Sequence, residues 1–158
     1  MNRPRLRAED VKIFTDAALG FFAQTTGHRA NVRTAYLLDP DAPAVWSDFH
    51  GRIDLGGRYR GNVTFAAPRA LLTHVLLSIG ESDYTDASHR DIVGEIANQM
   101  SGQARRHFGE AMDISPPRVI TQAQASAGDT ARTQPFVIPM LWDRYEAHLV
   151  VQMEQGQG

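Results

Sequence analysis

The sequence predicts one domain of the α/β class, in the α+β arrangement, with an antiparallel-rich sheet packed by long helices. The chain has 158 residues, of which 42% are hydrophobic, enough to bury one core. Its periodic segments run in the order helix, three strands, two helices, three strands, which differs from the βαβ alternation of a Rossmann array. We expect a single domain over residues 1–158, frayed at about 1–6 and 154–158.

The first elements follow from apolar spacing and turn composition. Residues 7–24 predict a helix, because Val11, Phe14, Ala18, Phe21 and Phe22 recur at helical spacing. Gly27 marks a turn or cap at its end. Residues 31–38 predict a strand, and residues 39–43 close it as a turn.

A hairpin and a second helix come next. Residues 45–55 and 58–67 predict two strands joined by a turn at Gly56-Gly57. Pro68 suits the first turn of a helix that ends near Gly80. That helix would bury the stripe Leu71, Leu72, Val75, Leu76 and Ile79.

The last third of the chain predicts strands around a loop. Residues 113–123 indicate the entry to a strand, and residues 124–134 have the composition of a loop. Residues 135–141 and 145–153 predict the final two strands, and the second alternates regularly between apolar and polar side chains.

A long helix is predicted over about 86–109, after N-cap candidates in the polar segment 81–88. At about 100° per residue, its apolar side chains form an ordinary core stripe of Ile92, Val93, Ile96, Ala97, Met100, Ala104 and Phe108. A second, narrow stripe faces away from the core and contains Asp91, Glu95, Asn98, Gly102 and Arg105. Glu95 and Asn98 are three residues apart, so their side chains are neighbours.

The presence of glycine inside this helix calls for an explanation, because each glycine lowers helix stability by about 1 kcal/mol relative to alanine. Gly102 lies one turn beyond Asn98, and Gly94 lies close by. One explanation is a partner that must approach closely. The alternative is that the glycines serve internal packing and that the charged residues belong to an ordinary solvated face, where ion pairs contribute little.

Composition excludes several classes of function. The formal net charge of −2 argues against binding nucleic acid through phosphate neutralisation. No cysteine is present, which rules out disulfides, thiolate metal sites and cysteine nucleophiles. The longest aliphatic stretch, 70–80, is shorter than the ~20 residues that span a bilayer. We expect a cytoplasmic protein that binds neither membrane nor nucleic acid.

Other catalytic patterns are absent from the sequence. The six histidines show no HxH or HExxH spacing, and we predict no metal site. No GxSxG elbow occurs, and the glycines of 55–61 fit a hairpin turn better than a phosphate loop.

The long helix resembles the CheC/CheX/FliY family of chemotaxis phosphatases. The family pattern is an acidic or serine residue, three intervening residues, Glu, two intervening residues and Asn, matched here by Asp91, Glu95 and Asn98. The continuation 101-SGQA-104 and the strand start 116-PPRVI-120 are also similar to the family. The motif occurs once, which favours a CheX-like arrangement over a CheC-like one.

The resemblance implies a CheX-like fold and hydrolysis of the aspartyl phosphate of a CheY-type receiver domain. Asn98 would orient the attacking water, and Glu95 would pair with the lysine of the receiver's active site. Gly102 and Gly94 would allow close approach, whereas Asp91 and Arg105 would lie at the partner-binding surface. The protein would carry no cofactor of its own, because the receiver holds the Mg²⁺.

The resemblance also implies a homodimer joined through sheet strands. Two other hypotheses remain at this point. The chain could be a non-catalytic module of the same fold that binds a receiver or another signalling partner. It could also be a structural protein in which the motif is a coincidence of a solvated helix.

Overall fold

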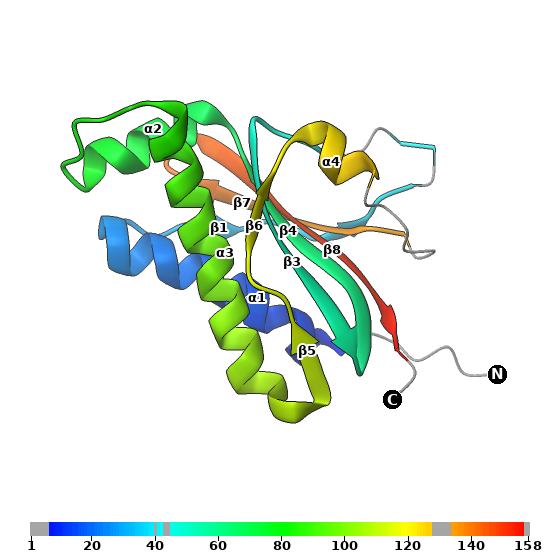
Figure 1. The fold of residues 1–158 in the computed structure, drawn as a ribbon. Coiled ribbons are helices and arrows are strands. Elements are labelled where there is room, and N and C mark those ends of the chain that lie inside the picture. The colour runs from blue at the N-terminus through cyan, green and yellow to red at the C-terminus, as the bar shows by residue number, and fades with distance from the viewer. Residues whose placement is uncertain (1–6, 40, 43–44, 128–133, 157–158) are drawn as a thin grey trace.

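The computed structural model describes residues 7–39, 41–42, 45–127 and 134–156, which form helices packed on an antiparallel sheet (Figure 1). The helices are α1 (Ala8–Phe21), α2 (Arg69–Ser78), α3 (Asp86–Phe108) and α4 (Gln122–Ala127), with a π-helical turn at Phe22–Thr26 and a 3₁₀ turn at Gly109–Ala111. The strands are β1 (Asn31–Val32), β2 (Tyr36–Leu37), β3 (Phe49–Gly57), β4 (Tyr59–Ala67), β5 (Met112–Ile114), β6 (Arg118–Ile120), β7 (Phe136–Trp142) and β8 (Tyr145–Gln155).

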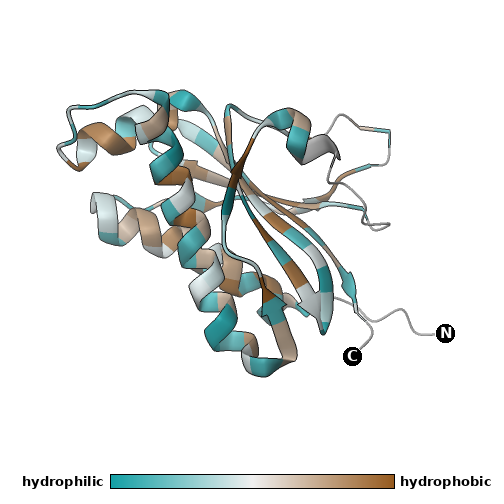
Figure 2. Ribbon diagram, in the orientation of Figure 1, coloured by the Kyte–Doolittle hydropathy of each residue, from teal (hydrophilic) through white to brown (hydrophobic). Residues whose placement is uncertain are grey.

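The sheet has the order β1-β7-β8-β4-β3-β5, with β2 also paired to β7 and β6 to β3. Each of these pairs is antiparallel, as the predicted fold class requires. Helices α1 and α3 pack against each other, and α3 lies over β3 (Figure 1). The strands of the hairpin alternate between polar and apolar residues (Figure 2), so one face meets these helices and the other is largely polar.

The predicted hairpin is confirmed, with β3 paired to β4 from Phe49↔Ala67 to Leu55↔Gly61. Its turn contains Gly57, whose φ of 103° lies in a region that side chains disfavour. The α2 helix begins at Arg69 rather than at Pro68, which instead occupies the N-cap. These strands and α2 supply much of the buried core predicted for this part of the chain.

Helix α3 and the sheet come very close together at Gly51 of β3. A Cβ atom on Gly51 would lie 2.8 Å from both the carbonyl oxygen and the Cγ1 of Val93, and 3.1 Å from the Cβ of Ala97. Real Cβ atoms do not approach backbone atoms so closely, so only glycine lets α3 rest directly on this strand. Beside it on the same face, Phe49 stacks on the buried His89 ring with centroids 5.5 Å apart.

A buried carboxylate joins α1, α3 and the hairpin. Asp10, in the first turn of α1, is only 3% exposed. Its Oδ2 accepts a hydrogen bond from the Tyr59 hydroxyl at 2.5 Å, and its Oδ1 accepts one from His107 Nε2 at 2.8 Å. Burial by itself would raise the pKa of Asp10, but these two hydrogen bonds and the nearby Arg58 hold it below its usual value.

The predicted strand 31–38 is split into β1 and β2, and Pro139 of β7 explains the split. Residues 31–32 pair with 140–141, whereas residues 36–37 pair with 136–137. Pro139 lies between the two ladders and has no N–H to donate to the edge strand, although its carbonyl still accepts from Arg33 N at 2.8 Å.

The strand entry expected over 113–123 is two short strands, β5 and β6, separated at Pro116-Pro117, and residues 122–123 already belong to α4. The loop predicted over 124–134 is wrong for residues 124–127, which belong to α4. Thr121 and Gln124 begin this helix by exchanging side-chain hydrogen bonds to each other's backbone N–H, at 2.9 and 3.1 Å. Residues 128–133 of that loop lie outside the described residues.

The sheet also extends further toward the C-terminus than predicted. Strand β8 continues to Gln155 instead of ending at residue 153, and Glu154 pairs with Arg60 at 2.9 Å. Of the ends expected to fray, at 1–6 and 154–158, residues 154–155 instead belong to β8, and residues 1–6 and 157–158 lie outside the described residues.

We predict that Gly51→Ala destabilises the protein by about 1–3 kcal/mol, because the added methyl forces α3 away from β3. Urea unfolding followed by circular dichroism measures the change. Gly20→Ala in α1 is the matched control, since a Cβ there meets no atom within 4 Å. That control should be neutral or more stable by up to about 1 kcal/mol. Equal stability of the two variants would contradict the close-contact explanation.

Candidate functional site

The long helix α3 runs over Asp86–Phe108, within one residue of its predicted bounds. Thr85 is its N-cap and accepts a hydrogen bond from Ser88 N at 3.4 Å. Arg105, Arg106 and His107 occupy its last turn, where positive charge suits the helix dipole. His89 fixes the first turn, because its Nδ1 donates to the Thr85 carbonyl at 2.7 Å and its Nε2 lies 2.6 Å from the Thr73 hydroxyl of α2.

Two faces of α3 differ as the sequence predicts. The predicted core side chains are all buried: Ile92, Val93, Ile96, Ala97, Met100, Ala104 and Phe108. Asp91, Glu95, Asn98 and Arg105 are exposed, whereas Gly94 and Gly102 are half-buried. We call these last six residues the acid–amide stripe. Helix geometry spreads it over roughly 20 Å along the axis of α3.

Glu95 and Asn98 are free to meet a partner. Within the described part of the chain, neither side chain makes a hydrogen bond or an ion pair with another residue. Asp91 has no such partner there either, and it lies within the helix, past the N-cap. A carboxylate and an amide at this spacing offer acceptors and N–H donors side by side on a surface that no described element covers.

The glycines of the stripe are not required by packing within the chain. A Cβ on Gly94 would lie 3.7 Å from Val119 Cγ2, and one on Gly102 would lie 3.7 Å from an Nη atom of Arg106. Both are ordinary van der Waals distances, in contrast to the contact at Gly51. Internal packing therefore does not explain why this helix carries two residues of low helix propensity.

Arg105 has an intramolecular contact that the sequence does not reveal. One of its Nη atoms donates to the Ile114 carbonyl at 3.2 Å, and Ser101 Oγ donates to the Ser115 carbonyl at 3.4 Å. These contacts tie the C-terminal half of α3 to the turn between β5 and β6. Arg105 therefore supports the helix in addition to lying on its exposed face.

The turn that follows β5 is itself anchored to the hairpin. Ser115 Oγ accepts a hydrogen bond from Asp54 N at 2.8 Å, and Arg118 pairs with the Asp54 carboxylate at 2.7 Å. His50 Nε2 accepts from Ser47 N at 3.0 Å and its Nδ1 donates to the Ile120 carbonyl at 3.3 Å. Burial lowers the pKa of His50, which suits this neutral form. Strand β6 is thus held firmly beside α3.

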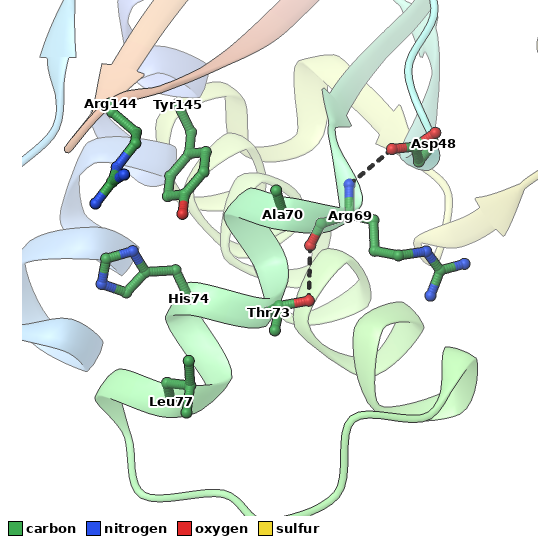
Figure 3. Close-up of a pocket in the computed structure, with 8 residues that line it drawn as sticks. All are labelled: Asp48, Arg69, Ala70, Thr73, His74, Leu77, Arg144 and Tyr145. Carbon is green, nitrogen blue, oxygen red and sulfur yellow. Dashed lines mark hydrogen bonds between the residues drawn. The ribbon is translucent and has the colours of Figure 1, made fainter.

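Elsewhere, a solvent-open hollow of about 630 Å³ lies against α2 and the turn between β7 and β8 (Figure 3). Several of its polar groups already have partners: Asp48 accepts from Arg69 N at 2.8 Å, Arg69 pairs with Asp86 at 2.7 Å, and Thr73 donates to the Arg69 carbonyl at 3.0 Å. None of the residues that line the hollow belongs to the acid–amide stripe.

The described residues offer neither a metal-binding cluster nor a membrane-spanning helix. In that part of the chain, no group of three or more His, Asp or Glu side chains is placed to hold a metal ion. The helices there include none that is both long enough and apolar enough to cross a bilayer.

Comparison with known proteins defines the class to which this fold and site belong. The profile of the family described as "Chemotaxis phosphatase CheX" matches residues 49–141, more than half of the chain and the whole of α3. The chain belongs to the CheX family of chemotaxis phosphatases. No curated protein sequence matches it significantly.

Solved structures share the fold over most of the chain. A CheX protein from Desulfovibrio desulfuricans has a TM-score of 0.74 and 20% identity, with 92% of this chain and 99% of that chain covered. A CheC-like protein from a Shewanella species gives 0.77 and 18%, covering 94% and 99%. CheX from Borrelia burgdorferi, solved as a complex with CheY, BeF₃ and Mg²⁺, gives 0.68 and 15%, covering 94% and 100%.

Proposed function

We propose that this protein hydrolyses the aspartyl phosphate of a CheY-type receiver domain, using the acid–amide stripe of α3. The observation that carries the proposal is the exposed Glu95–Asn98 pair, which has no partner among the residues that the structure describes and lies inside the segment that matches the CheX family. The Borrelia burgdorferi CheX chain, which has the same fold, was solved with CheY, and this supports the class of partner.

The chemistry suits a site that contains an amide and no strong base. An acyl phosphate is already reactive, so a phosphatase needs mainly to hold a water molecule in line with the phosphorus. The Asn98 amide would orient that water, accepting a hydrogen bond from it and donating one to the phosphoryl group. The water oxygen then bonds to phosphorus as the bond to the aspartate oxygen breaks, releasing inorganic phosphate and a free carboxylate. The Mg²⁺ that neutralises charge in this reaction would belong to the receiver.

Glu95 would position the two proteins. Its carboxylate, with no partner among the described residues, would pair with the lysine of the receiver's active site. A charge-assisted pair of this kind becomes stronger when the interface excludes water. Asp91 would lie at the edge of the same surface, and Gly94 and Gly102 would let the receiver approach the helix closely. Arg105 would contribute at the rim while it holds the turn after β5.

A homodimer is the second part of the proposal. Strands β1 and β2 form one edge of the sheet and expose three apolar side chains, Val32 (42%), Tyr36 (42%) and Leu37 (59%). An edge of this kind invites pairing with a second chain. Dimerisation there would leave α3, which lies near the opposite edge, available to the receiver.

We predict that Asn98→Ala abolishes the stimulation of receiver dephosphorylation and leaves the fold intact, because Asn98 is exposed and its side chain makes no hydrogen bond with another described residue. Candidate receivers are phosphorylated with a small phosphodonor, and phosphate loss is followed with and without the protein. Unchanged stimulation by the variant would disprove the mechanism. Binding of a receiver without any stimulation by the wild-type protein would instead favour a non-catalytic module.

Glu95→Ala should weaken receiver binding and lower the rate together, by about tenfold or more, since it removes one member of a buried ion pair. Glu95→Gln keeps the shape but not the charge and should behave similarly. Titration of the receiver against each variant gives the dissociation constant, and the same samples give the rate. If both variants bind and react like the wild type, the docking role of Glu95 is wrong.

Light scattering should give a mass of twice 17.5 kDa for the wild-type protein. Leu37→Lys places a charge in the proposed β1–β2 interface and should shift the mass to that of one chain. Leu77→Lys is the matched control, because Leu77 is equally exposed (58%) but lies on α2. A monomeric wild type, or equal effects of the two substitutions, would exclude this interface.

A further inference from the structure

Val119 is an exposed apolar residue that touches the acid–amide stripe. It lies on β6 directly opposite Gly51, and paired residues on neighbouring strands point to the same face of the sheet. Because Gly51 has no side chain, α3 packs closely on β3 there, and Val119 lies beside the helix. Its Cγ2 lies 3.7 Å from the position that a Cβ on Gly94 would occupy, yet Val119 remains 38% exposed.

Gly94 is what leaves this valine uncovered. Any side chain at position 94 would extend over Val119, and helix geometry places Asn98 one turn further along the same face. The free protein would accept an alanine at position 94 without a clash and would gain helix stability from it. Glycine at position 94 therefore lowers helix stability without improving packing within the chain, and this points to a requirement outside the chain.

The support beneath Val119 is rigid. The neighbouring Ile120 carbonyl accepts from His50, and Arg118 pairs with Asp54, so the residues on both sides of Val119 are fixed to β3 or to side chains on it. An apolar group held in one place loses little conformational freedom when a partner covers it. Isolated exposed valines are common on protein surfaces, and it is this location that distinguishes Val119.

We propose that Val119 is a specificity-determining contact of the receiver-docking surface, and that Gly94 is kept small so that the receiver can reach it. The inference rests on the proposed function and names a residue outside the Asp91–Glu95–Asn98 motif, in the strand start 116–120 that also resembles the family. The receiver domain that engages Glu95 and Asn98 would place an apolar side chain in the angle between α3 and β6. Val119 acts on affinity and on the choice of receiver, whereas Asn98 acts on the chemical step.

The test uses a CheY-type receiver with Mg²⁺ and beryllium trifluoride for binding, and the phosphorylated receiver for steady-state kinetics. We expect Val119→Ser to raise the dissociation constant and KM by about fivefold and to leave kcat within about twofold of the wild type. Val119→Thr, which preserves shape and strand propensity, should give a smaller rise in the same direction. Leu77→Ser removes a comparably exposed apolar side chain from α2 and should change neither constant.

Gly94→Ala separates an effect on docking from an effect on folding. The expected changes in stability and in affinity for the receiver have opposite signs. We expect this variant to unfold at a higher temperature than the wild type and to bind the receiver more weakly. The proposal would be overturned if Val119→Ser and Gly94→Ala both bound the receiver with wild-type affinity. It would also be overturned if Leu77→Ser lost as much affinity as Val119→Ser. If the wild-type protein neither binds nor dephosphorylates any receiver, the proposed function itself fails, a result that differs from loss of the Val119 effect alone.

Discussion

The structure depends on how closely α3 lies against β3. Gly51 permits the Val93 carbonyl and the Ala97 methyl to rest almost on the strand backbone. This close approach sets the distance between the helix and the sheet, and the opposite face of α3 is left open to solvent. The buried His89, stacked on Phe49, and the Arg105 contact to Ile114 then fix the helix near each end. The arrangement of the site follows from this packing, since every residue of the acid–amide stripe belongs to α3.

Long elements with strong periodicity could be predicted from the sequence. The α3 helix has nearly its predicted bounds because its apolar residues recur from Ile92 to Phe108, over about four turns, and Thr85 caps it. The hairpin could be predicted equally well, because two segments that alternate between apolar and polar residues flank the pair Gly56-Gly57. The division of α3 into a buried and an exposed face, which places Glu95 and Asn98 together, required no tertiary information. Membership of the CheX family, suggested by the same residues, is confirmed by the family profile.

Features that depend on distant contacts could not be predicted in this way. The burial of Asp10 requires Tyr59 and His107 to meet it from two other elements, and no local pattern signals this. The division of 31–38 into β1 and β2 depends on Pro139, more than a hundred residues away. The α4 helix is different, because Thr121 and Gln124 have the spacing of a capping box, a local signal that the Ser, Gly, Asp and Thr residues of the following segment obscured.

Glu95 and Asn98 lie three residues apart on one helix, whereas many active sites gather groups from several elements. Their mutual geometry is therefore fixed by local hydrogen bonding in α3, and tertiary packing decides only how the pair is presented. A mutation elsewhere that weakens the fold would reduce the number of competent molecules without distorting the pair in those that remain folded. Surrounding positions could thus change during evolution to suit a new partner while the reactive geometry stays constant.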